Sequence, residues 1–138
     1  CSEPRPTAMP AKWRCVGEPE SFTMYLPPET ECASPRFDLG CLGGYAGNGF
    51  KIKPHFDTGE VHLDVVDRSG AFLDIQGSPA RAVRTPHSIT LVFEEEGAGV
   101  PSQKLGLAQD PRLAFEVECD SEQACRRAWL ALQSVRVW

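Results

Sequence analysis

Hydrophobic and polar residues alternate along several short stretches of the chain, most clearly in "SITLVFEE" (88–95) and "RLAFEVE" (112–118). A period of two places every second side chain on the same face of a β-strand. Turn residues, as in "DTGE", "DRSG" and "GSP", separate the stretches. The expected strands are 12–16, 21–26, 50–56, 60–66, 71–76, 88–95 and 112–118. This pattern predicts antiparallel strands with one buried face.

The C-terminal segment "DSEQACRRAWLALQSV" (120–135) has a different period. Its apolar residues recur at i, i+3, i+4 and i+7, as in an amphipathic helix: Cys125, Ala128, Trp129 and Leu132. Asp120 is the expected N-cap, with Gln123 three residues later in a capping box. A last short strand is expected over "VRVW" (135–138). The predicted fold class is α+β: a mainly antiparallel β-sheet or sandwich with one C-terminal amphipathic helix, stabilised by disulfides.

The composition is that of one globular domain, with 138 residues of which 41% are hydrophobic and 24% charged. Pro4, Pro6 and Pro10 predict a flexible tether over residues 1–11, followed by a single β-rich domain over 12–138. The net charge of −5 argues against a nucleic-acid partner, because phosphate binding needs a concentrated basic surface. No apolar run approaches the ~20 residues that a membrane-spanning helix needs.

Six cysteines are many for a chain of this length: Cys1, Cys15, Cys32, Cys41, Cys119 and Cys125. In an oxidising compartment such a set forms disulfides, whereas in the cytosol it more often binds metal. A zinc site of the common type needs close pairs such as C-x₂-C, and the sequence has none. The two shortest spacings predict the bridges Cys32–Cys41 and Cys119–Cys125, and hence an exported protein.

The segment "KIKPHFDTGEVHLDV" (51–65) is typical of a β-hairpin that turns at Thr58-Gly59. In that register His55 lies opposite His62, and the apolar residues form the core face: Ile52, Phe56, Val61, Leu63 and Val65. Two histidines flanked by carboxylates could hold zinc or copper. The alternative is a solvated sheet face with cross-strand charge pairs, Lys53 with Asp64 in particular, and the sequence favours it.

Two loops are the candidate contact elements. Tyr45 and Asn48 lie in a glycine-rich stretch, which predicts an exposed loop with an aromatic and an adaptable polar side chain. Glu94, Glu95 and Glu96 follow a strand and lead into a second glycine-rich loop. They are either solvated charges or an acidic finger that fits a basic or metal-containing cleft of a partner.

The sequence carries no signature of catalysis. It has no G-x-S-x-G elbow, and its glycine-rich stretch is followed by a strand where a phosphate-binding loop requires a helix. Cys–His chemistry needs a reactive thiol, and most cysteines are expected in bridges. The chain is therefore predicted to be no enzyme and to need no cofactor.

The first residues, "CSEPRPTAMP", resemble the mature start of bacterial lipoproteins. In that family, signal peptidase II cuts before a cysteine whose sulfur carries a diacylglyceryl group. The resemblance implies that Cys1 is lipidated, that the domain is anchored in the periplasm, and, from Ser2, that it resides at the outer membrane. Five cysteines then remain, and Cys15 is the one expected to be left over. The alternative is that Cys1 is an ordinary cystine partner, of Cys15 for example.

In size, location and acidity the chain is similar to the periplasmic immunity lipoproteins that are paired with type VI secretion effectors. That resemblance implies a protein-binding module that blocks a secreted cell-wall-degrading enzyme, with the two loops at Tyr45–Asn48 and Glu94–Glu96 as contact elements. The alternative function is a structural or assembly lipoprotein of an envelope or secretion complex. Both functions need a protein partner. The only membrane contact expected is through the N-terminal lipid.

Overall fold

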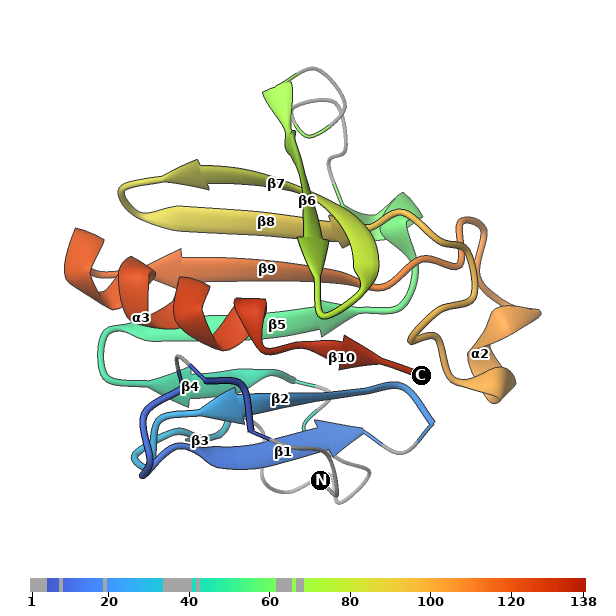
Figure 1. Ribbon diagram of the computed structural model, residues 1–138. Helices are drawn as coiled ribbons and strands as arrows, with labels where there is room; N and C mark the ends of the chain where they lie inside the picture. Colours follow the sequence, from blue (N-terminus) through green and yellow to red (C-terminus); the bar gives the residue numbers. More distant parts are fainter. Residues whose placement is uncertain are drawn as a thin grey trace.

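The computed structural model describes residues 5–7, 9–18, 20–33, 41, 43–61, 66 and 69–138. They form two antiparallel sheets and a C-terminal helix (Figure 1). The strands are β1 (Arg14–Glu18), β2 (Phe22–Leu26), β3 (Glu31–Cys32), β4 (Tyr45–Gly47), β5 (Phe50–His55), β6 (Ala71–Ile75), β7 (Ser78–Thr85), β8 (Ser88–Phe93), β9 (Ala114–Cys119) and β10 (Arg136–Val137). The helical elements are the 3₁₀ turn η1 (Thr58–Glu60), α2 (Ser102–Leu105) and α3 (Glu122–Gln133). The predicted fold class is confirmed.

The larger sheet has seven strands in the order β3-β4-β5-β9-β8-β7-β6, and the smaller has the order β1-β2-β10. Helix α3 crosses the larger sheet over β9 and β5 and also contacts β2, so it lies where the two sheets meet (Figure 1). Phe22 of β2 and Phe115 of β9 pack edge to face, with ring centroids 5.0 Å apart. Both rings are fully buried, as is Leu132 of α3. One hydrophobic core therefore joins both sheets and the helix.

The alternation in β8 and β9 is confirmed: Ile89, Leu91, Phe93, Phe115 and Val117 are all buried. These side chains face the core, whereas Thr90 and Glu116 face outward. The two strands pair with Leu91 opposite Phe115, so apolar residues meet across the ladder.

The C-terminal helix begins one residue later than the sequence predicts. Ser121 is the N-cap of α3, because its hydroxyl accepts the backbone N–H of Ala124 at 3.1 Å. Asp120 precedes the cap, and its N–H donates to Gly49 O at 2.7 Å. The predicted apolar stripe of the helix is confirmed, with three members buried and one partly buried: Cys125, Ala128, Leu132 and Trp129.

The predicted hairpin over residues 51–65 is wrong. Strand β5 pairs with β4 on one edge and with β9 on the other, so neither edge remains for a strand over 60–66. The chain turns away at η1 instead, where the Asp57 carboxylate accepts the N–H of Gly59. Val61 and Val66 then pack on the outer face of the larger sheet against Val92. Residues 62–65, including His62, lie outside the described residues.

Three strands were not expected from the sequence. Strand β7 has proline in its second position and little alternation, and it joins β6 through a turn at 76–77 where Gln76 and Gly77 both have positive φ. Strands β3 and β4 are only two and three residues long. Strands so short or so irregular carry no readable period.

The bridges Cys32–Cys41 and Cys119–Cys125 are both present, as predicted. The second ties the end of β9 to the first turns of α3. Cys15, which was expected to be left over beside a lipidated Cys1, is itself disulfide-bonded, and this corrects the expectation. Its partner lies outside the described residues.

Met9 is buried in the main hydrophobic cluster, so the core includes a residue of the expected tether. Arg5 donates to the backbone oxygens of Pro10 and Trp13 and stacks on the Tyr25 ring. Among the helices of the described chain, none combines the length and the apolar character that crossing a membrane takes.

Candidate functional site

The connection between β8 and β9, residues 94–113, is the candidate functional site and is called the β8–β9 loop below. Strands β7 and β8 are joined by only two residues, 86–87, whereas the β8–β9 loop contains α2 and projects from the opposite end of the sheet (Figure 1). Loops longer than about 12–15 residues with little secondary structure of their own are uncommon in compact domains and are usually functional or linker segments. In this loop the described helix α2 has only four residues. The fold itself needs no such length between two neighbouring antiparallel strands.

Hydrogen bonds between its two ends close the loop. The N–H of Phe93 donates to Leu113 O at 2.9 Å, and the N–H of Gly97 donates to Pro111 O at 2.7 Å. The loop therefore continues the β8–β9 ladder for a few residues before it widens. The two ends of the loop are therefore neighbours.

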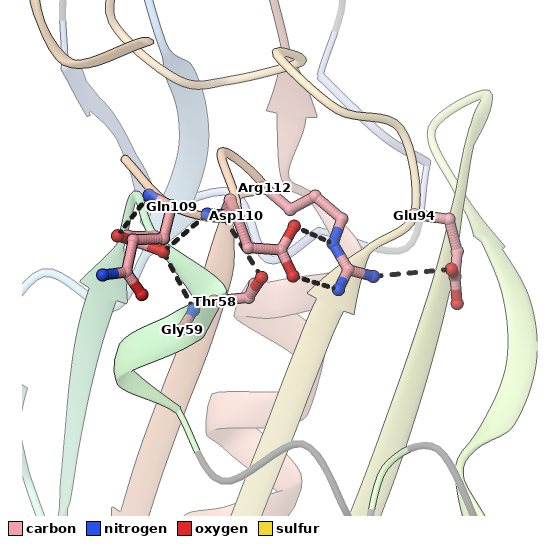
Figure 2. A network of polar contacts seen from close by, with 7 residues as sticks. Thr58, Gly59, Glu94, Gln109, Asp110 and Arg112 are labelled. Carbon is pink, nitrogen blue, oxygen red and sulfur yellow. Dashed lines mark hydrogen bonds and ion pairs between the residues drawn. The ribbon is translucent and has the colours of Figure 1, made fainter. Parts of the chain in front are cut away.

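Asp57, the N-cap of η1, anchors the C-terminal end of the loop. Its carboxylate accepts the backbone N–H groups of Gly59, Gln109 and Asp110 at 2.9, 3.0 and 3.1 Å (Figure 2). The backbone N–H of Thr58 adds a bond to Asp110 O at 3.0 Å. The three N–H groups that the Asp57 carboxylate accepts, that of Gln109 above all, stabilise its charged form and lower the pKa of Asp57. The turn after β5 and the end of the β8–β9 loop are thus held together.

A chain of ion pairs fixes the base of the same loop. The carboxylate of Asp110 accepts both Nε and Nη2 of Arg112, at 2.9 and 2.6 Å (Figure 2). This bidentate pair lowers the pKa of Asp110. Arg112 also lies 3.9 Å from Glu94, which pairs with Arg81 of β7 at 2.8 Å. Each of these four side chains is partly buried.

The predicted acidic finger is therefore divided. Glu94 is committed to the ion pairs at the base of the loop, whereas Glu95 and Glu96 are exposed. The finger that remains for a partner consists of these two residues.

Large apolar side chains gather at the end of the molecule that carries the loop. Leu107 is 85% exposed and Leu105 40%, and both belong to the β8–β9 loop. Trp138, 53% exposed, lies beside the loop, because its carbonyl accepts the N–H of Gly99 at 3.1 Å. Phe72 of β6, 70% exposed and stacked under Arg81, is the remaining exposed large apolar residue of the described chain. A cavity of about 180 Å³ beside Leu107 is lined also by Phe56, Asp57, Lys104 and Ala108.

The other predicted contact loop is exposed only in part. Tyr45 lies in β4 and is only 3% exposed, contrary to the expected exposed aromatic. Its hydroxyl lies 3.2 Å from Oε1 of Glu18, and burial, reinforced by the Glu18 charge, raises the pKa of Tyr45. Asn48 is exposed in the two-residue turn that joins β4 to β5. The stretch is part of the sheet, where Tyr45 fills the core.

The part of the outer face formed by β5 and β9 has the mixed charge of a solvated surface. Lys51 and Lys53 of β5 lie opposite Glu118 and Glu116 of β9, and these four residues line a cavity of about 530 Å³. Nε2 of His55 lies 2.9 Å from Glu116. The cross-strand partner position of Lys53 is thus Glu116, and not Asp64 as expected. Within the described residues, no three His, Cys, Asp or Glu side chains are grouped so that they could hold a metal.

Sequence reasoning missed Leu105, Leu107 and the anchoring role of Asp57. The available signal was the length of chain between the strands predicted at 88–95 and 112–118. The bonds of Asp57 to residues more than fifty positions away had no local signal.

No protein-family model, no curated protein and no solved structure matches the chain. The proposals for its function therefore rest on the chemistry of the chain itself.

Proposed function

We propose that the chain is a non-catalytic protein-binding domain that blocks a secreted cell-wall-degrading enzyme. The observation that carries the proposal is the position of the exposed apolar side chains. Three of the four large ones in the described chain, Leu105, Leu107 and Trp138, lie on or beside the β8–β9 loop. Single exposed apolar residues are ordinary, but several at one end favour a binding surface.

The energetics suit a small contact surface. Full burial of a leucine side chain contributes about 1.5–3 kcal/mol, so two leucines and a tryptophan could supply the central anchors of an interface. The C-terminal end of the loop is also held in place before binding, because Asp57 accepts the Gln109 N–H and Asp110 pairs with Arg112. Binding then costs less conformational entropy than ordering a flexible loop would.

The disulfides support an oxidising compartment for this function, because such bonds persist outside the cytosol. The lipid anchor on Cys1 stays a prediction. Cys15 is disulfide-bonded, so it is not the leftover cysteine that this prediction expected. The alternative for Cys1, an ordinary cystine partner, also stays a prediction. Mass spectrometry of the native N-terminal peptide distinguishes the two, since an acyl chain adds several hundred daltons.

A wall-degrading target is supported by the similarity in size and acidity to immunity proteins. It also agrees with the shape of the site, because a rigid loop that projects from a sheet suits a concave active site. Enzyme–inhibitor interfaces are typically pre-organised in this way.

The test uses the purified domain immobilised on a resin and an envelope extract from the producing cells or a competing species. Recovered proteins are identified, and each recovered hydrolase is assayed on purified cell walls by loss of turbidity. We expect the domain to retain a hydrolase and to abolish its activity at a stoichiometric ratio. Recovery of a stable envelope complex with no hydrolase would contradict the proposal and support the alternative, an assembly protein.

A further inference from the structure

We infer that the partner receives the β8–β9 loop in a basic cleft that contains an apolar pocket for Leu107. This inference rests on the proposed protein-binding function and adds the chemistry of the partner surface. Leu107 is the most exposed of the large apolar side chains in the described residues, and it lies on the loop that contains α2 and projects from one end of the larger sheet in Figure 1. A convex apolar element of this kind is buried by a concave surface and not by a flat one.

The charges around Leu107 define the rim of that cleft. Glu94 and Asp110 are neutralised within the molecule by Arg81 and Arg112. The exposed Glu95 and Glu96, by contrast, make no ion pair within the part of the chain that the structure describes.

A third carboxylate comes from another segment. The hydroxyl of Ser102, the first residue of α2, lies 3.5 Å from Oε2 of Glu20, so the turn between β1 and β2 brings Glu20 next to the loop. Asp57 adds a fourth negative charge, although three N–H groups already bind its carboxylate.

Two cations lie at the same end, and each is held over an aromatic ring. Nζ of Lys104 is 5.5 Å from the centroid of Phe56, and the guanidinium of Arg136 is 5.6 Å from that of Trp138. Among the described residues, four carboxylates against two cations leave this end negative. A basic cleft complements that charge and steers association, whereas an anionic lipid surface would be repelled.

The test begins with a photo-reactive benzoylphenylalanine in place of Leu107, introduced into the full chain in producing cells. The matched control carries the same group in place of Phe72, which is also highly exposed but lies on the edge strand β6. We expect a protein cross-link from position 107 and not from 72, at a partner peptide that lines a cleft and carries several Lys or Arg residues. Cross-links to lipid, to an acidic or flat surface, or from neither position would overturn the inference.

The partner that the cross-link identifies is then purified in its free form. Its association kinetics are measured with the wild-type domain and with the double variant E95K/E96K. Its control is E31K/E118K, which changes the net charge equally at two exposed sites on β3 and β9. We expect E95K/E96K to lower the association rate constant about tenfold at low salt and to flatten its salt dependence. The control should stay within about twofold of the wild type, and equal effects of the two pairs would overturn the inference.

These outcomes separate the inference from the proposed function. If the partner is a hydrolase and its association rate constant is unchanged by E95K/E96K, the inhibitor function is supported and the basic cleft is contradicted. A basic cleft on an envelope subunit that is no hydrolase retains the inference and removes the inhibitor function.

Discussion

Two carboxylates hold distant segments of this protein together, one inside the molecule and one at its surface. Glu18 at the end of β1 is only 6% exposed and lies 2.7 Å from the N–H of Cys41 and 3.2 Å from the hydroxyl of Tyr45. Asp57 accepts three N–H groups in a far more open place. The chemistry is the same, but the depth differs.

The difference in depth separates a structural role from a role at the site. A buried carboxylate cannot replace a lost partner with water. Loss of one of its hydrogen bonds therefore costs free energy of unfolding, and these bonds stabilise the whole fold. A half-buried carboxylate such as Asp57 can exchange its partners for water, so we expect its bonds to affect the nearby end of the β8–β9 loop more than the whole fold. Glu18 thus belongs to the core, and Asp57 to the candidate contact surface.

The largest expected effect is that of Glu18→Ala. It leaves the N–H of Cys41 and the hydroxyl of Tyr45 without their acceptor in a buried place, so we expect a loss of about 2–4 kcal/mol in the free energy of unfolding. Urea unfolding of variant and wild type measures the loss. Tyr45→Phe removes one of the two bonds and should cost only about 1 kcal/mol. Equal losses in the two variants would show that Glu18 is no shared acceptor.

A second effect is expected at high pH. The pKa of Tyr45 is raised in the folded protein, so folding disfavours the phenolate. A group with a raised folded pKa stabilises fully below its unfolded pKa, about 10 for tyrosine, and loses that stability as the pH rises further. Stability should therefore fall above about pH 10, and less steeply in Tyr45→Phe. The difference in phenolate absorbance between wild type and variant follows Tyr45 directly, and ionisation near pH 10 without unfolding would contradict its burial.

Asp57→Ala should act locally. The variant removes the acceptor of the Gln109 and Asp110 N–H groups, so we expect amide exchange at these two positions to rise about tenfold or more. Exchange in β8 and β9 should change little, because the core is untouched. Asp74→Ala, at an exposed position of β6, is the matched control. An equal rise of exchange throughout the sheet would show that Asp57 supports the fold and not only the loop.

The smallest effect is expected in acid. The pKa values of Asp57 and Asp110 are both lowered, so their bonds stabilise the loop above the model-peptide value of 3.8 and are lost as the pH falls through the folded values below it. The amide NMR signals of Gly59, Gln109 and Asp110 should shift together with a midpoint below 3.8. Three separate midpoints, or one above 3.8, would show that the carboxylate is not their common acceptor.

The contrast between Glu18 and Asp57 also shows what a sequence reveals. The alternation in β8 and β9 and the stripe of α3 were readable, because each burial pattern repeats within a few residues. The short bridge spacings likewise predicted both described disulfide pairs. The pairing of β5 with β9 was not readable, since β9 follows about sixty residues later and no local pattern indicates that pairing.

The same limit explains the errors about the site. Tyr45 lies among glycines, and only its contact with Glu18, 27 residues earlier in the chain, reveals that it is buried. Residues 94–96 are three consecutive glutamates that the sequence does not distinguish. In the structure only Glu94 lies near Arg81 and Arg112, and it forms the ion pairs. Such choices depend on tertiary contacts, which no local pattern encodes.

The most direct test of the β8–β9 loop as the contact surface compares Leu107→Asp with Phe72→Asp. Both residues are highly exposed, so neither change should alter the urea midpoint. The partner recovered from the envelope extract is titrated against each variant by calorimetry. We predict a loss of affinity of about 30-fold or more for Leu107→Asp, as for a central anchor of an interface, and a change within about threefold for Phe72→Asp. Unchanged affinity in Leu107→Asp, or an equal loss in both variants, would contradict the assignment of the contact surface to this loop.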